Sequence, residues 1–579
     1  MYHITSADLF SLVALLYYEK GQLPQKSELS LASSLDFLLM FSQLFAVNPF
    51  IGSGITGDGD FPTPEALLEH LDYLGIDRCL VASLTARDYA PACGNRELLE
   101  LLAPHRDRLL PCLILTPAAC FEDGEIDFFR RQMAAGHRAI RLCPAEMEFQ
   151  MRDVERAISL LADLKPVLFF DTPYNSNYLD MHDVAEIAAK YPQVTFVCTR
   201  QMWGRFQTTL DLMWRCPNVM LDISWLHMND TIKMVIRDFG EDRLVFGIGA
   251  KAQYGAAIAA LAHAQITDAQ REKIAHGNLE RILGVAPLTK RLCHEPALLE
   301  QKPVWRLFRE GKSIKDAVPG EIVDIHAHTG SFTLGWCIPN YSAPLPEQFR
   351  HFVEFMDRHG VSRIIDANAR ALLGDSVRWN REAETCAAAH PGRFSGWLAF
   401  NVHYAHTFSE EILDDFFSRG YFAGIKLLPS YHWVPVSDPR YRIVWEYADK
   451  HHLPVLCHTW GDRYDAPKFF RDIVPHYPNM RLIIGHSGGS ELQDRLDAED
   501  LVRQYPNVYL DSCAIFCCPR PWQEAIREFG NTRFLFGSDA GGHNEAYELG
   551  NVLSLPLPDQ ELLPILGENW RRLQSEVVF

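Results

Sequence analysis

The sequence predicts an α/β protein built from two tandem (β/α)8 barrels, and three observations support this. The chain has 579 residues, about twice the roughly 250 residues of one such barrel. Segments of the first half recur in the second half in the same order. Short β-branched and apolar runs also alternate with amphipathic stretches of about 10–15 residues, which is typical of βα units that build a parallel sheet.

The internal repeat has an offset of about 280–290 residues. The matching segments are 139–144 with 424–429, 191–192 with 477–478, 217–222 with 506–511, and 236–247 with 526–537. Four matches in one register do not arise by chance. We therefore expect a first barrel over 1–285, a linker rich in charge and proline over 286–318, and a second barrel over 319–579.

Eight strands are expected in the second half. They fall near 322–328, 362–366, 394–401, 423–428, 454–459, 481–486, 507–511 and 533–539. An open, doubly wound sheet is the alternative, but no glycine-rich phosphate loop follows the first strand. Polar residues also end five different strands, which favours the closed barrel.

Composition limits the classes of partner. Apolar residues make up 47% of the chain and charged residues 22%, and the formal net charge is −19. An acidic protein lacks the basic face that nucleic acids and anionic membranes require, so a small-molecule substrate is expected. No apolar run approaches the roughly 20 residues of a membrane helix, and the opening stretch 1–20 is interpreted as a helix of the folded domain.

Cysteine usage indicates a reducing compartment. The chain has 14 cysteines, mostly in apolar strand-like runs and without a CxxC pair, so neither a disulfide framework nor a zinc ribbon is predicted. The expected location is the cytoplasm. Cys513, Cys517 and Cys518 cluster on one loop, where a reactive thiol is the alternative to the commoner buried, inert one.

Polar residues gather at the predicted strand ends of the second half. His326 and His328 are two apart in strand one, so both imidazoles point to the same side. His458 ends strand five, His486 ends strand six and Asp539 ends strand eight. Active sites of this barrel lie at the carboxyl ends of the strands, so these five side chains form a candidate metal and catalytic site.

This half resembles the amidohydrolase superfamily, in particular the amidohydrolase-related branch of hydrolases and non-oxidative decarboxylases. The resemblance implies that His326, His328, His458 and Asp539 are metal ligands. It implies that His486 binds a second metal or acts as an acid or base. It places Lys426 where binuclear members carry a bridging carbamylated lysine, although Lys426 could instead form a salt bridge or hold a substrate anion.

Chemistry agrees with the implied ligand set. Imidazole and carboxylate suit a divalent ion such as Zn²⁺, one or two per chain, and an ion with an open position activates water. Asp539, which would contact both the metal and the water, is the expected proton acceptor, with His486 and Lys426 as the other catalytic candidates. Asp511 could orient His486, although its counterpart Asp222 in the first half favours a structural role.

Aromatic loops after the strands are the candidate substrate-binding elements. The residues are Trp336, Tyr431, His432, Trp433, Trp460 and Arg463. They would suit a flat or apolar substrate with an anionic group, and packing of surface loops would explain them equally well.

The first half has lost the ligands. The repeat aligns His326 and His328 with Asn48 and Phe50, and Lys426 with Arg141. It aligns His458 with Phe170 or Asp171, His486 with Arg200, and Asp539 with Gly249. None of these can replace the ligand set, so the first barrel is predicted to be a degenerate copy without metal, kept for packing or for shaping the neighbouring cleft.

The sequence therefore favours a metal-dependent hydrolase of an amide, ester or lactone in the second barrel, because the decarboxylases compared lack a lysine in strand four. The alternative is a metal-dependent decarboxylase or related lyase acting on an aromatic or unsaturated acid. A non-catalytic binding protein has little support. An intramolecular contact between the barrels is expected, and a homo-oligomer could also form.

Overall fold

The computed structural model describes residues 40–172, 178–201, 203–330, 343–461 and 463–579. Residues Phe41–Phe579 form one compact unit. The expected opening helix over 1–20 and the candidate Trp336 both lie outside the described residues.

The second half forms an eight-stranded parallel sheet in sequential order, β13 to β20, as expected. The strands are β13 (Val323–Ala327), β14 (Arg363–Asp366), β15 (Phe394–Phe400), β16 (Phe422–Leu427), β17 (Pro454–Cys457), β18 (Arg481–Ile484), β19 (Val508–Asp511) and β20 (Phe534–Leu535). The sheet closes because the Ile325 amide donates to the Phe536 carbonyl at 2.9 Å and the His328 amide donates to the Ala540 carbonyl at 2.8 Å. This is a closed (β/α)8 barrel.

The first half repeats the architecture with shorter strands. They are β1 (Phe45–Ala46), β2 (Phe50–Ile51), β5 (Arg78–Ser83), β6 (Leu109–Pro111), β7 (Leu113–Ile114), β8 (Ala139–Leu142), β9 (Val167–Asp171), β10 (Thr195–Thr199), β11 (Val219–Asp222) and β12 (Leu244–Val245), with a small hairpin of β3 (Ser53–Gly54) and β4 (Gly57–Asp58). Two backbone hydrogen bonds join the sheet segments into one ring. The Cys112 amide donates to the Val81 carbonyl at 2.8 Å, and the Ile248 amide donates to the Val47 carbonyl at 3.2 Å. The prediction of two tandem barrels is confirmed.

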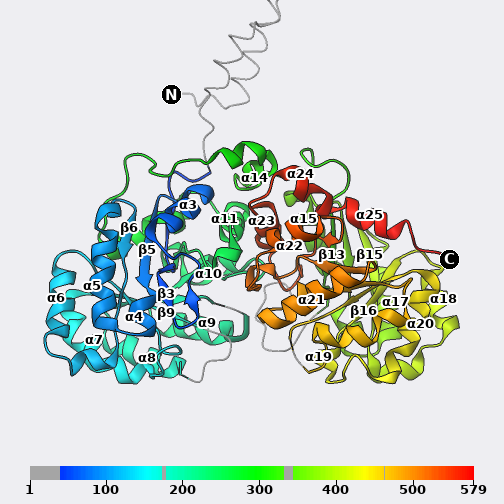
Figure 1. Ribbon diagram of the computed structural model, residues 1–579, viewed down its shortest axis with the longest axis horizontal. Coiled ribbons are helices and arrows are strands. Elements are labelled where there is room, and N and C mark those ends of the chain that lie inside the picture. Colours follow the sequence, from blue (N-terminus) through cyan, green and yellow to red (C-terminus); the bar gives the residue numbers. More distant parts are fainter. Residues whose placement is uncertain (1–39, 173–177, 202, 331–342, 462) are drawn as a thin grey trace, which may run out of the picture. The chain divides into compact units, whose positions relative to one another are not determined.

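Helices follow the strands of each barrel and surround it (Figure 1). In the first half they are α3 (Pro64–Leu74), α4 (Leu84–Asp88), α5 (Pro91–Leu102), α6 (Glu125–Ala134), α7 (Glu155–Leu161), α8 (Met181–Lys190), α9 (Phe206–Arg215), α10 (Thr231–Phe239), α11 (Ala256–His263), α12 (Asp268–Glu272) and α13 (Asn278–Leu283), and α14 (Pro303–Phe308) lies in the linker. In the second half they are α15 (Leu345–His359), α16 (Ala369–Leu373), α17 (Ser376–Ala387), α18 (Glu410–Phe417), α19 (Pro429–His432), α20 (Arg442–His451), α21 (Leu492–Gln504), α22 (Trp522–Phe529), α23 (Glu545–Leu553), α24 (Asp559–Leu562) and α25 (Glu568–Gln574).

Local sequence signals set the ends of these helices. In α3, the Thr63 side chain accepts a hydrogen bond from the Ala66 amide, Pro64 occupies the first turn, and Gly75 ends the helix in the left-handed conformation. This order of cap, proline and terminal glycine is the one that satisfies the free backbone groups at both ends.

Each barrel interior is filled by apolar side chains from its strands. The second contains Val323, Ile325, Ile365, Trp397, Leu456 and Ile483 among others, and the first contains Phe45, Leu80, Val167, Phe169 and Val197. Because these interiors are packed, the polar residues at the strand ends gather at one rim of each barrel.

Helices α11 and α23 join the two barrels. Every residue of α11 and of α23 is buried. Close approach requires glycine at position 550, because a Cβ there would lie 2.2 Å from the Ala259 Cβ. The Asn551 side chain also donates to the Ala252 and Gln253 carbonyls, each at 2.8 Å. Among the described residues, no helix is both long and apolar enough to cross a membrane.

Candidate metal centre

Three of the predicted ligands meet at the rim of the second barrel. His326 lies in β13, His328 follows it, and Asp539 follows β20; one ligand atom from each lies within 4.8 Å of the others, and all three are buried. The His328 Nε2 to Asp539 Oδ1 distance is 3.2 Å, and the His326 Nε2 to Asp539 Oδ1 distance is 3.8 Å. Asp539 has a positive φ of 56°, a conformation that is costly for a non-glycine residue and recurs at functional sites.

Hydrogen bonds orient both imidazoles of this cluster. His326 Nδ1 lies 2.6 Å from Asp511 Oδ2, and His328 Nδ1 lies 2.8 Å from the Ala367 carbonyl oxygen. Nδ1 therefore carries a proton in each ring, and each Nε2 lies on the side of Asp539. A histidine that donates from one nitrogen to a carboxylate or carbonyl and binds a metal with the other is the usual arrangement in metal sites.

Charge also favours a cation here. Burial alone would raise the pKa of Asp539, but the hydrogen bond from His328 and the charges of His543 and His328 hold it well below its usual range. Burial, together with the nearby Lys426 charge, holds the pKa of His326 well below its usual range, so this ring is a neutral donor. Two imidazoles and one carboxylate in a closed pocket fit a divalent ion of the zinc type.

Lys426 reaches the same cluster from β16. Its side chain is fully buried, and Nζ lies 2.7 Å from His326 Nε2. Burial lowers the pKa of Lys426, and the charges of Asp511 and Asp539 counteract this effect. The amine therefore occupies the position that the sequence predicts for it, in contact with a predicted ligand.

The other two predicted histidines lie beside this cluster. His458 Nδ1 is 3.0 Å from Asp465 Oδ2, and its ring centre is 4.8 Å from that of His486. His458 belongs to none of the triads whose ligand atoms lie within 4.8 Å in the described part of the chain, so its ring would have to shift to bind the same ion. The sequence prediction that His458 is a ligand stays a prediction.

His486 is held by its backbone. Its amide donates to Asp511 Oδ1 at 2.7 Å, its φ is 55°, and its ring centre lies 4.9 Å from that of His326. Its buried Nδ1 has no hydrogen-bond partner among the described residues. A buried imidazole nitrogen of this kind needs a ligand or water, as expected of a second ligand or an acid–base group.

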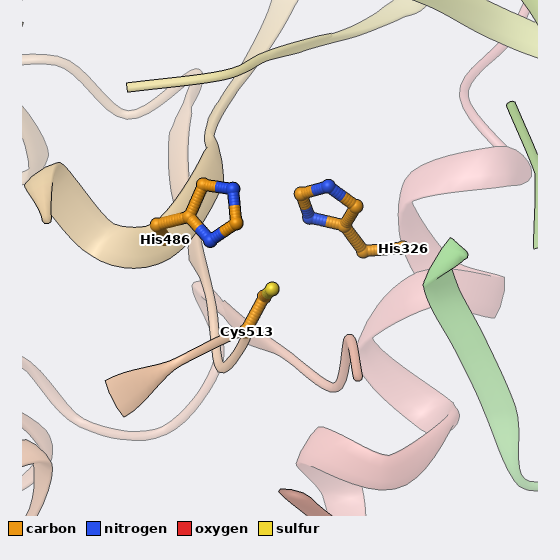
Figure 2. Close-up of side chains that lie close together, drawn as sticks. All are labelled: His326, His486 and Cys513. Carbon is orange, nitrogen blue, oxygen red and sulfur yellow. The ribbon is translucent and has the colours of Figure 1, made fainter. Parts of the chain in front are cut away.

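Four polar residues near the site were not predicted as site residues. Asp465 orients His458, and Glu548 Oε1 lies 2.8 Å from His543 Nδ1. Cys513, assigned only as a thiol on a loop, points into the space between His326 and His486 (Figure 2). A sequence signal existed for His543, which follows the predicted ligand Asp539 by four residues across two glycines.

The predicted substrate loops surround the site unevenly. Trp460 and Tyr431 lie next to the histidines, with ring centres 5.1 Å from His486 and 5.4 Å from His458. His432 is buried, and its Nε2 lies 2.7 Å from the Leu372 carbonyl oxygen, so it stabilises its own loop. Trp433 is 76% exposed. Arg463 is exposed and donates to the Tyr464 hydroxyl at 2.7 Å.

At the rim of the first barrel, different residues form hydrogen bonds equivalent to those at the rim of the second barrel. Asp222 Oδ2 accepts from the Arg200 amide at 3.1 Å, as Asp511 accepts from that of His486. Asp222 Oδ2 also accepts from Asn48 Nδ2 at 3.0 Å, where Asp511 pairs with His326.

A third contact also corresponds between the two barrels. Arg141 donates to Asn48 Oδ1 at 3.1 Å in the first barrel, at the position where Lys426 contacts His326 in the second. Arg141 also pairs with Asp171. The rim of this barrel therefore carries an arginine–carboxylate network in place of imidazole ligands.

A loop of the first barrel reaches the rim of the second. The Asn544 amide donates to the His227 carbonyl at 2.6 Å, and Met228 and His543 form a β-bridge. The rings of His227 and His543 meet edge to face at 4.5 Å. The Tyr547 hydroxyl donates to the Ser224 carbonyl at 2.8 Å. The loop after β11 thus braces the segment that follows Asp539.

Comparison with known proteins gives the family. The amidohydrolase family model matches residues 48–285 and 323–573, which together make up most of the chain and cover both halves. The chain belongs to the amidohydrolase family. Membership implies a divalent metal, and the buried cluster of His326, His328 and Asp539 fits one.

Similar solved structures each correspond to less than half of this amidohydrolase. They include 5-carboxyvanillate decarboxylase from Sphingomonas paucimobilis, at 13% identity and a TM-score of 0.36 over 44% of this chain and 99% of that one. The 2,6-dihydroxybenzoate decarboxylase from Rhizobium has 14% identity and a TM-score of 0.34 over 42% and 99%. A 5-carboxyvanillate decarboxylase from Novosphingobium aromaticivorans, solved with manganese, has 13% identity and a TM-score of 0.33 over 42% and 97%. No curated protein matches the sequence.

Proposed function

We propose that the second barrel is a metal-dependent decarboxylase of an aromatic or unsaturated carboxylic acid. The observation that carries this proposal is the buried Lys426 amine, 2.7 Å from His326 Nε2. The pocket already contains the buried carboxyl groups of Asp511 and Asp539. A carbamate on Lys426 would add a third negative charge beside them, whereas an ammonium group offsets them and can hold a substrate carboxylate.

The remaining residues fit a flat acid. A divalent ion on His326, His328 and Asp539, for which zinc is the proposed identity, would supply a Lewis acid for a substrate oxygen. Lys426 binds the anionic group, and Trp460 and Tyr431 pack against the ring. The carbon–carbon bond breaks, its electron pair stays on the substrate carbon, and carbon dioxide leaves. A proton taken up from solvent is then relayed to that carbon by Asp539 or His486.

Hydrolysis of an ester, amide or lactone is the second candidate. It is favoured by the position of Lys426 at the end of β16, where the binuclear members that this half resembles carry a carbamate. In that case Asp539 would accept the proton of the attacking water and transfer it to the leaving group.

Product analysis separates the two reactions. The full chain, loaded with zinc or manganese, is incubated with a panel of hydroxybenzoates, unsaturated acids, aryl esters and lactones. We expect one equivalent of carbon dioxide per acid consumed and, in heavy water, deuterium on the carbon that lost it. Cleavage of an ester or lactone without carbon dioxide would establish the second candidate instead. Asp539→Asn is the control for a contaminating activity.

A further inference from the structure

A second group of metal-type side chains lies beside the first. Cys513 follows β19, and Asp539 and His543 follow β20; one ligand atom from each lies within 4.8 Å of the others. All three side chains are buried, with 0% exposure at Cys513 and 3% at His543. The group shares only Asp539 with the cluster of His326 and His328.

Glu548 of α23 fixes two parts of this group at once. Its Oε1 lies 2.8 Å from His543 Nδ1, and its Oε2 accepts from the Ala514 amide, next to Cys513, at 3.2 Å. Glu548 is fully buried. His543 Nε2 therefore lies on the side of Asp539 Oδ2, at 3.7 Å. Glu548 therefore orients the His543 ring as Asp511 orients the His326 ring: a carboxylate binds Nδ1 and leaves Nε2 directed toward the metal position.

Neighbouring residues close the group from solvent. His227 and Phe516 pack against the His543 ring, with ring centres at 4.5 Å and 6.1 Å. Burial and the nearby carboxylates of Asp539, Asp511 and Glu548 raise the pKa of the Cys513 thiol well above its usual range. A site of closed, carboxylate-rich character stabilises a cation more than an uncharged core does.

We propose that Cys513, Asp539 and His543 hold a second divalent ion of the zinc class. One thiolate, one imidazole and one carboxylate are ligands that zinc and cobalt accept, and three protein ligands leave a fourth position open. The ion replaces the thiol proton of Cys513, and a proton that His543 Nε2 would carry is released with it, so two positive charges are exchanged for two.

This site differs from a carbamate-bridged pair, because Lys426 is not one of its ligands. The shared Asp539 makes the site an extension of the proposed metal centre, but its test does not depend on turnover. A thiolate bound to Co²⁺ gives a charge-transfer absorption band, whereas imidazole and carboxylate ligands alone do not.

The experiment titrates the untagged, metal-free full chain with Co²⁺. We expect two equivalents to bind, with the thiolate band growing in during one of them. Cys513→Ser and His543→Gln should each lose that equivalent and keep the other. Glu548→Gln should weaken it by about 10–100-fold. Cys517→Ser, on the same loop but outside the group, is the matched control and should keep both. Circular dichroism and a thermal melt show which variants fold.

Each other result overturns the proposal. One equivalent without the band would mean that the group is a buried ion pair beside an inert thiol. One equivalent with the band would mean that Cys513 joins His326 and His486 at a single ion, the other arrangement that its position allows. Two equivalents that survive Cys513→Ser but not Lys426→Met would instead indicate a carbamate-bridged pair.

Discussion

Replacing Asp511 by Asn tests how the metal centre is oriented. The two carboxylate oxygens accept from different groups, the His326 imidazole at 2.6 Å and the His486 amide at 2.7 Å. An asparagine side chain offers one oxygen and one NH2 group. One of the two donors must therefore face another donor, and all three residues are buried away from bulk solvent.

The size of the effect follows from these contacts. A buried donor left without an acceptor costs about 1–3 kcal/mol. Loss of the carboxylate partner of a metal-binding histidine typically reduces metal affinity by about 10–100-fold, which corresponds to about 1.4–2.7 kcal/mol. The first estimate applies to the free energy of unfolding, which should fall by about 1–3 kcal/mol. The second applies to metal binding: Asp511→Asn should weaken the first equivalent of metal by about one to two orders of magnitude.

The assay is a competition between the protein and a chelator of known affinity, followed by the free energy of unfolding of the metal-free chain. Asp222→Asn is the matched control, because Asp222 accepts from the Arg200 amide and from Asn48 in the first barrel. We expect both variants to lose stability and only Asp511→Asn to lose metal. Equal metal affinities in the two variants would refute the assigned role of Asp511.

Four further predictions follow from the same contacts. Asp539→Asn should lower kcat at least about a hundredfold with the fold intact, and activity within about tenfold of wild type would contradict its role. Lys426→Met should keep all the metal that the wild type binds and raise KM for a carboxylate substrate, whereas loss of metal with rescue by short carboxylic acids would indicate a carbamate. Arg200→Ala should leave turnover nearly unchanged, because its side chain pairs with Asp171 in the first barrel. Burial lowers the pKa of His70 to about 3, so the contribution of His70 to stability should be full above pH about 6.5 and fall below it by about 1.4 kcal/mol per unit, and His70→Leu should reduce the measured slope between pH 5 and 7 by that amount.

The fold was predictable because hydrophobic periodicity and the repeat specify it. All eight expected strands of the second half form, and each predicted segment contains its observed strand or overlaps most of it. The eighth strand is shorter than predicted, because only Phe534–Leu535 of the expected 533–539 pair with the neighbouring strand. After this strand, Asp539 adopts a positive φ. This backbone conformation brings its carboxylate toward the histidines, and a strand pattern in the sequence does not predict it.

The site was predictable only in part. Spacing places His326 and His328 on one face and the strand ends bring Asp539 to them, but contacts across loops depend on tertiary structure. Asp465 lies seven residues after His458 and is oriented by a loop, and Glu548 reaches both His543 and the Cys513 loop from a helix. Neither has a periodic or motif signal in the sequence.

Retention of the first barrel has a physical explanation in these contacts. Its strand-seven aspartate, Asp222, still accepts from a strand-six backbone amide and a strand-one side chain, although the groups of metal-type side chains found among the described residues all lie in the second barrel. The aspartate therefore has a role in joining strand ends that does not need a metal. What the first barrel supplies is a surface: α11 covers α23, and the loop of His227 braces the segment between Asp539 and Glu548. Since Glu548 in turn orients His543, loss of the first barrel would alter the rim of the second without removing a single residue from it.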